Sequence, residues 1–135
     1  MVEKPDISVA RFPRLVKTAD LDDDGTLDLI TGNQSATGTS TVSVLLGAGE
    51  GAFSDAIDYD AGARLSSFTL ADVDRDGDLD LVTANDLSVG VVLNDGEARF
   101  TRPAAYTVPA SAVFATVTDV NSNGHVDLVT FERLS

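Results

Sequence analysis

Short runs of apolar and β-branched residues alternate with polar turns along the whole chain. No stretch shows the 3.6-residue period of an amphipathic helix, and Gly and Pro return at strand-length intervals. The pattern predicts four strands in the middle of the chain, at about 66–71, 79–84, 88–93 and 100–107. It predicts four more near 13–19, 27–32, 41–47 and 53–59, and two near 112–118 and 126–131. We therefore expect an all-β fold.

The first two strands of each set are joined by the same kind of polar loop. The three loops begin at Asp20, Asp72 and Asp119, and each has an oxygen-bearing side chain at positions 1, 3 and 5, Gly at position 6 and Asp at position 9. Three such matches about fifty residues apart indicate an internal repeat. The first repeat has about five extra residues within the polar stretch 32–40, which we expect to be a surface loop.

This loop pattern suits calcium, a hard cation that takes roughly six to eight oxygen ligands. Alternating side chains of a tight loop point inward, and the Gly permits a positive φ where the chain doubles back. A backbone carbonyl at position 7, which is Thr26, Asp78 or His125, can add an oxygen, and the Asp at position 9 can close the site. The loops are therefore candidate calcium sites.

The loop pattern has two other interpretations. An EF-hand begins in the same way but closes with Glu at position 12 between two helices. Here position 12 is Thr31, Thr83 or Thr130 and the flanks are β-branched, so we expect the loops to join strands. A solvated Asp-Gly turn without metal is the second alternative. Crowded carboxylates argue against it in the first two loops, but Asn121 and Asn123 bring no charge, so we expect a weaker third site.

Composition narrows the class of protein. The 135 residues are enough for a single repeat domain over 1–135, with units at about 11–60, 61–107 and a partial unit at 108–135. Twelve of the twenty-two acids lie in the three loops, so three Ca²⁺ would change the net charge from −13 to −7.

The absence of Cys excludes disulfides and thiolate metal sites. With two lysines and no basic patch we expect no nucleic-acid partner. No apolar run approaches the roughly 20 residues of a membrane helix, so we expect no membrane insertion.

Several motifs together resemble a known family. They are the Asp-x-Asp-x-Asp-Gly-x-x-Asp-Leu loop, a Val-x-Val-Leu-Leu-Gly strand, a Gly-x-Gly-x-Phe turn and the repeat length. They resemble FG-GAP/VCBS repeats, the blades of integrin-α-type β-propellers, over about residues 10–131. The resemblance implies about two and a half blades of four antiparallel strands, with structural calcium between the first two strands of each blade. Carried over to this chain, the ligands are Asp20, Asp22, Asp24, Thr26 and Asp28; Asp72, Asp74, Asp76, Asp78 and Asp80; and Asp119, Asn121, Asn123, His125 and Asp127.

The resemblance implies two or three Ca²⁺ per chain and a non-catalytic, calcium-stabilised segment for extracellular or cell-surface binding or adhesion. The expected ligand is a protein or a glycan. A lectin on the same scaffold and an accessory domain of a secreted enzyme are the alternatives. The absence of Trp counts against the lectin, and a single His, with no Cys and no Ser/His/Asp set, counts against an enzyme.

The expected number of blades indicates which partners this chain needs. Propellers have about four to eight blades, so we expect the remaining blades of a longer protein, or else further copies of this chain, to complete the ring; we favour the former. The chain does not open with the pattern of a signal peptide. Four aromatic residues, Phe53, Tyr59, Phe100 and Tyr106, recur at fixed repeat positions and are expected to pack in a shared core.

Overall fold

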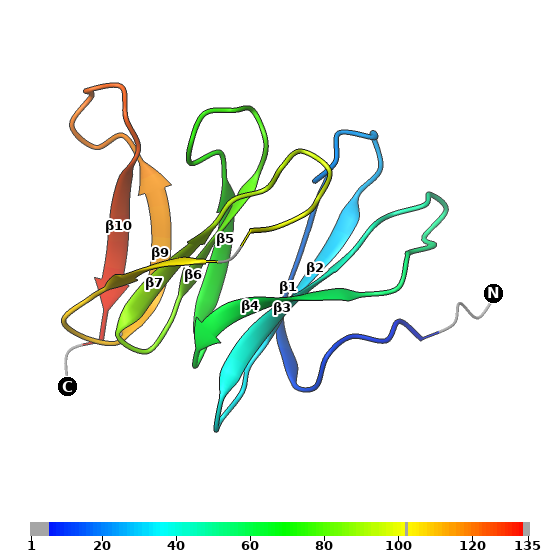
Figure 1. Ribbon diagram of the computed structural model, residues 1–135, viewed down its shortest axis with the longest axis horizontal. Coiled ribbons are helices and arrows are strands. Elements are labelled where there is room, and N and C mark those ends of the chain that lie inside the picture. The colour runs from blue at the N-terminus through cyan, green and yellow to red at the C-terminus, as the bar shows by residue number, and fades with distance from the viewer. Residues whose placement is uncertain (1–5, 102, 134–135) are drawn as a thin grey trace.

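The computed structural model describes residues 6–101 and 103–133, and these form ten β-strands and no helix (Figure 1). The strands are β1 (Pro13–Ala19), β2 (Asp28–Asn33), β3 (Thr39–Leu45), β4 (Ile57–Ala63), β5 (Ser67–Ala71), β6 (Asp80–Ala84), β7 (Ser88–Val92), β8 (Ala104–Thr107), β9 (Ala112–Thr118) and β10 (Asp127–Glu132). The predicted all-β class is confirmed. In this part of the chain no helix is long and apolar enough to cross a membrane.

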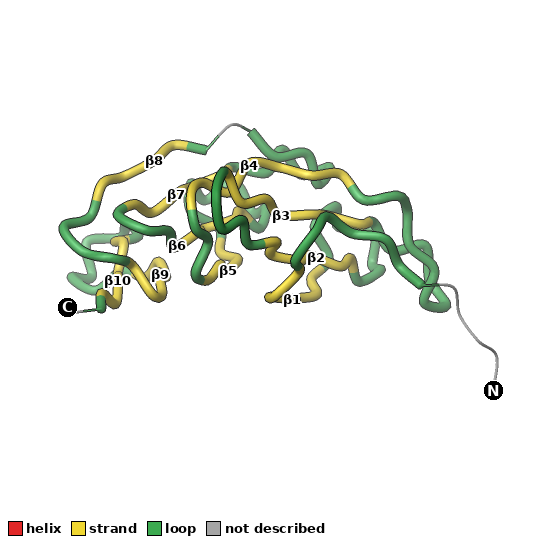
Figure 2. Tube along the Cα trace, turned by 90° about the horizontal axis from the view of Figure 1, so that it is seen from below, coloured by secondary structure: helices red, strands yellow, loops and turns green. Residues whose placement is uncertain are grey.

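The strands form three antiparallel sheets in chain order. The first sheet is β1-β2-β3-β4, the second is β5-β6-β7-β8, and the third consists of β9 and β10. Figure 2 shows the sheets side by side in an arc, with β1, β5 and β9 along one side and β4 and β8 along the other. Each four-stranded sheet therefore has the up-and-down order of a propeller blade. The predicted fold class is confirmed, although the described strands do not close a ring.

The fourth strand of each four-stranded sheet starts later than predicted. β4 and β8 begin about four residues after the expected starts at 53 and 100. Phe53 and Phe100 instead form isolated bridges with Gly47 and Asn94, across the turns that follow β3 and β7. Pro103, which has no N–H to donate to a ladder, directly precedes β8. The two Phe residues close turns, so the predicted strands 53–59 and 100–107 were wrong at their N-terminal ends.

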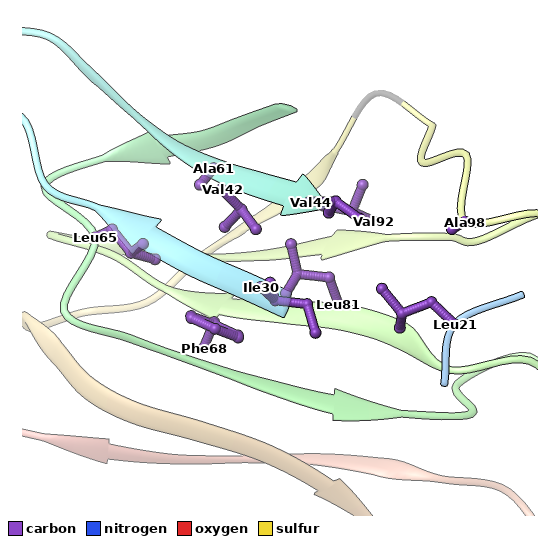
Figure 3. Close-up of a cluster of buried hydrophobic side chains, with 10 residues drawn as sticks. All are labelled: Leu21, Ile30, Val42, Val44, Ala61, Leu65, Phe68, Leu81, Val92 and Ala98. Atoms are coloured by element: carbon purple, nitrogen blue, oxygen red, sulfur yellow. The ribbon is translucent and has the colours of Figure 1, made fainter. Parts of the chain in front are cut away.

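Two hydrophobic clusters hold the sheets together. The larger one lies between the first and second sheets (Figure 3) and contains Leu21, Ile30, Val42, Val44, Ala61, Leu65, Phe68, Leu81, Val92 and Ala98. The smaller one lies between the second and third sheets and contains Val82, Ala84, Val89, Ala112 and Ala115. Successive residues of a strand point to opposite faces, so Leu81 joins the first cluster and Val82 the second. The second sheet is consequently buried on both faces.

The repeated aromatic residues have different environments. Tyr59 packs edge-on against Phe100 of the next sheet, with ring centroids 5.2 Å apart, and both contact the larger cluster. Their predicted packing role is confirmed. Phe53 is half-buried, whereas Tyr106 is 54% exposed. The prediction for Tyr106 was wrong because the described third sheet has no turn that corresponds to the one carrying Phe100.

Candidate metal centre

The three polar loops join β1 to β2, β5 to β6 and β9 to β10, and all lie at the same end of the molecule (Figure 1). Their backbones share one conformation, with positive φ at position 4 and again at the Gly of position 6. These residues are Asp23 (φ 55°) and Gly25 (85°), Arg75 (67°) and Gly77 (99°), and Ser122 (58°) and Gly124 (86°). The Gly was predicted from the sequence. The residue at position 4 was not, because Arg and Ser carry no signal for this conformation.

The first loop curls around its own carboxylates. Asp20 accepts hydrogen bonds from the backbone N–H groups of Asp24 (3.2 Å) and Gly25 (2.9 Å). One carboxylate oxygen from each of Asp20, Asp22 and Asp28 lies within 4.8 Å of the other two. The carboxylate of Asp24 accepts from an N–H group two residues later (2.7 Å) and is not in this cluster. The loop thus brings together three of its four predicted side-chain ligands.

The second loop repeats this arrangement. Asp72 accepts from the N–H groups of Arg75 (2.7 Å) and Gly77 (3.2 Å). Asp72, Asp74 and Asp80 form the second cluster of carboxylate oxygens within 4.8 Å of one another. The remaining predicted side chain, that of the Asp at position 5, again accepts from the N–H group two residues later (3.0 Å). Both clusters consist only of oxygen donors, which is the donor set that calcium prefers.

The third loop has the same backbone but less charge. Asp119 accepts from the N–H groups of Asn123 (3.1 Å) and Gly124 (2.7 Å), and the Asn123 side chain accepts from the N–H of His125 (2.8 Å). At position 3, Asn121 donates an amide N–H toward Asp127 (3.5 Å). Positions 1, 3, 5 and 9 supply two carboxylates here and four in each of the other loops. The third loop therefore presents a weaker field to a cation.

The Asp at position 9 has a second role, which the sequence did not reveal. Asp80 is fully buried, and its two oxygens accept from the N–H of Val73 within the loop (2.7 Å) and from the N–H of Asn94 in the turn after β7 (2.9 Å). Burial raises the pKa of Asp80, and these two bonds oppose that rise. The equivalent bonds of Asp28 come from Leu21 N–H (2.8 Å) and Gly47 N–H (2.8 Å). In both four-stranded sheets this Asp ties the loop to the turn after the third strand.

Asn94 also links the first two loops. Its buried side-chain amide donates to the carbonyls of Leu21 (2.9 Å) and Leu79 (3.2 Å), one from each loop. Gly47 holds the equivalent position in the first sheet, where an added Cβ would lie 2.3 Å from the carbonyl oxygen of Leu27. The only sequence signal was a polar residue aligned with a Gly.

Carboxylates repel one another within the first two loops and also between them. Burial raises the pKa of Asp22, and the charge of Asp24 adds to the rise. Burial also raises the pKa of Asp78, with further contributions from Asp76 and from Asp23, which belongs to the first loop. Repulsion between like charges disfavours the ionised form, and a bound cation would reverse the effect.

The family of FG-GAP-like repeats matches this chain twice, over residues 20–83 and over residues 72–130. The two matches overlap and together span all three loops and the strands between them. Searches of curated proteins and of solved structures found no match. Because the matched residues make up well over half of its length, the chain belongs to the family of FG-GAP-like repeat proteins.

Proposed function

We propose that this chain is a non-catalytic, calcium-stabilised binding module that works outside the cell or at its surface. Its FG-GAP-like repeats imply a propeller-like binding domain. The observation that carries the calcium proposal is the pair of carboxylate clusters in the first two loops. None of the ion pairs among the described residues involves these acids. A cation would offset a repulsion of about 1 kcal/mol in water for each pair of charges 4 Å apart.

The proposed ligands in each loop are the side chains at positions 1, 3, 5 and 9 and the backbone carbonyl at position 7. In the first two loops they are Asp20, Asp22, Asp24, Asp28 and the carbonyl of Thr26; and Asp72, Asp74, Asp76, Asp80 and the carbonyl of Asp78. In the third they are Asp119, Asn121, Asn123, Asp127 and the carbonyl of His125. We expect two ions per chain, and a third where calcium is plentiful.

Thermal unfolding with and without a chelator tests this proposal. Ligand that binds only the folded state stabilises it by about 2.7 kcal/mol at a hundredfold excess over its dissociation constant. We therefore expect the chelator to lower the melting temperature by several degrees, and added Ca²⁺ to restore it. Mg²⁺ at the same concentration is the control, because it demands a smaller octahedral site and should restore less. An unchanged melting curve would sink the calcium proposal.

The non-catalytic part of the proposal rests on the residue inventory. The chain has no Cys, and its one His, His125, is exposed in the third loop. The clustered carboxylates are assigned to calcium and are not free for acid–base chemistry. The extracellular part is supported by calcium itself, since calcium modules outside cells commonly bind in the range of about 0.1–1 mM. The proposed ligand is a protein or a glycan.

We also propose that further strands pair with β10. The outer edge of β10 has no partner among the described residues, whereas the equivalent strands β2 and β6 each lie between two neighbours. The strands would come from remaining blades of a longer propeller or from further copies of this chain. Native mass spectrometry in calcium counts copies and ions together. A monomer with two or three ions favours blades from a longer protein, and a discrete oligomer favours copies. Loss of all ions would count against the calcium sites.

A further inference from the structure

A hollow of about 410 Å³ lies at the end of the molecule opposite the three polar loops. Three turns meet there, β2–β3, β4–β5 and β6–β7, at the lower end of the sheets in Figure 1. The hollow spans the first and second sheets, and its lining combines small residues with one ion pair, that of Arg64 and Asp86. The lining residues are Ala36, Thr37, Gly38, Thr39, Ala63, Arg64 and Asp86. Its volume lies within the usual range for small-molecule sites, roughly 300–1,000 Å³.

One wall of this hollow is peculiar to the first repeat. Residues 36–39 belong to the stretch that carries about five extra residues, and they lie at the surface as predicted. The ends of the predicted surface loop 32–40 were wrong, because Gly32 and Asn33 belong to β2 and Ser40 to β3, and all three are buried. Ser40 is fully buried, and its hydroxyl accepts from the N–H groups of Ser35 (3.1 Å) and Leu65 (3.1 Å). The N–H of Asp86 donates to the carbonyl of Ala63 (3.3 Å). Hydrogen bonds therefore hold all three turns in place around the hollow.

An ion pair lines the hollow and has capacity for further hydrogen bonds. Arg64 donates to Asp86 over 3.3 Å, and the other carboxylate oxygen of Asp86 accepts from the hydroxyl of Ser111 (2.7 Å). The Arg64 side chain is 65% exposed and that of Asp86 39% exposed. A guanidinium has five N–H donors and a carboxylate about four acceptor sites, so most of the Arg64 donors and about half of the Asp86 acceptor sites remain open to a ligand. Arg64 also has a φ of 52°, which is uncommon for a residue other than Gly.

We propose that this hollow binds a neutral saccharide through the Arg64–Asp86 pair and the Thr37 and Thr39 hydroxyls. An anion placed there would meet the carboxylate of Asp86, and a cation would meet the guanidinium of Arg64. A sugar hydroxyl donates and accepts at once, so neighbouring hydroxyls satisfy both partners of the pair. The inference rests on the proposed binding function and assigns it a site and a ligand class.

The test is a titration of the whole chain, labelled with ¹⁵N and saturated with calcium, followed by amide chemical shifts. The probes are the methyl glycosides of glucose, galactose and mannose, with methyl glucuronide as the charged counterpart of the glucoside. We expect at least one neutral glycoside to cause saturable shifts at Gly38, Thr39, Arg64 and Asp86, with a dissociation constant on the order of 1 mM. Arg64→Gln and Asp86→Asn should each weaken binding at least tenfold.

Matched variants separate binding from folding. Arg99→Gln removes another exposed, ion-paired arginine, which lies in the β7–β8 turn and contacts Glu97 at 2.6 Å. It should leave the titration unchanged. Thr37→Val removes a hydroxyl outside any strand, and so tests the hollow even if the ion-pair variants fold poorly. It should weaken binding measurably.

Three results would overturn the inference. The first is the absence of saturable shifts from the neutral glycosides at about 100 mM, a hundredfold above the expected dissociation constant. The second is shifts that Arg64→Gln and Thr37→Val leave intact. The third is preference for the glucuronide together with tighter binding by Asp86→Asn, which would make the hollow an anion site. Counting bound calcium in the same samples separates the calcium proposal from the saccharide proposal. Calcium binding without saccharide binding would refute only the proposed saccharide site.

Discussion

β6 and β10 both carry the tetrapeptide Asp-Leu-Val-Thr, yet only β6 is buried along its whole length. Leu81 of β6 is 1% exposed, and Leu128 at the same repeat position in β10 is 39% exposed. β6 lies between β5 and β7 and is covered on both faces, whereas among the described residues β10 pairs only with β9. The same residues therefore form a central strand in one sheet and an edge strand in another. Local sequence specifies the strand, and its neighbours decide the burial.

The loops before these strands differ in the same way. Asp80 and Asp127 both accept a hydrogen bond from the N–H of the residue at position 2, Val73 or Val120. Only Asp80 also accepts from Asn94, in the turn after a third strand. Asp127 meets a side-chain amide of its own loop instead. A complete sheet thus fixes the polar loop from outside, and the third loop depends on its own residues.

The largest expected difference between the second and third loops comes from replacing the Asp at position 9, which is Asp80 or Asp127. Asp80→Ala leaves two backbone N–H groups without an acceptor and should destabilise the protein by about 3 kcal/mol. Asp127→Ala exposes its N–H partner to water and should cost only about 1 kcal/mol. Urea unfolding in chelator measures both, because without calcium the loss of a proposed calcium ligand does not add to the difference. Equal losses would mean that the bond from the turn does not matter to the second loop.

A smaller contrast concerns calcium affinity. Asp76→Ala removes a charge from a loop of four predicted carboxylate ligands, and Asn123→Ala removes a neutral oxygen. We expect Asp76→Ala to weaken its site about tenfold, which is about 1.4 kcal/mol, and Asn123→Ala to weaken its site less. Calorimetric titration of calcium into chelator-treated protein measures the change. A larger loss from Asn123→Ala would reverse our ranking of the sites.

One pair of glycine variants should destabilise the second and third loops equally. Gly77 and Gly124 have φ of 99° and 86°, and a Cβ would meet nothing within 4 Å at Gly77 and only the end of Arg75, at 3.9 Å, at Gly124. Substitution by Ala should therefore cost about 1 kcal/mol at each site through the backbone alone. Thermal unfolding of the two variants checks this. A clear difference between them would show that the loop conformation depends on the sheet around it.

The smallest effect is the pH dependence of the calcium-free protein. Burial, together with neighbouring acids, raises the pKa of Asp22, Asp78 and Asp80 above the ordinary 3.8. A raised folded-state pKa means that the folded protein binds these protons more tightly than the unfolded chain. The stability they contribute is therefore present below pH 3.8 and is lost as the pH rises through the folded-state values.

The measurement is the melting temperature in chelator from about pH 3.8 upward, in steps of pH, since calcium itself needs ionised ligands. The melting temperature should fall with rising pH in chelator and rise with pH in calcium. Asp78→Asn should flatten the fall. A melting temperature that rises with pH in chelator would contradict the proposed repulsion within the loops.

Most of the local structure could be predicted from short stretches of sequence. The strands at 13–19 and 112–118 lie where the pattern placed them, and the three loops join the expected strands. Alternation, Asp-Gly turns and glycine with positive φ act within about ten residues. The predicted starts of β4 and β8 were wrong because Phe53 and Phe100 form bridges across their own turns. Strand propensity does not encode such a contact.

By itself, then, the sequence determined the strands, the polar loops and the repeat that relates them, because backbone preference and turn chemistry are properties of neighbouring residues. Only the tertiary structure decided which copy of Asp-Leu-Val-Thr is buried and that Asn94 joins two loops. It also decided that Arg64 and Asp86, from two different turns, line one hollow. Burial and hydrogen bonding between sheets depend on residues far apart along the chain, and their positions are set only when the sheets pack.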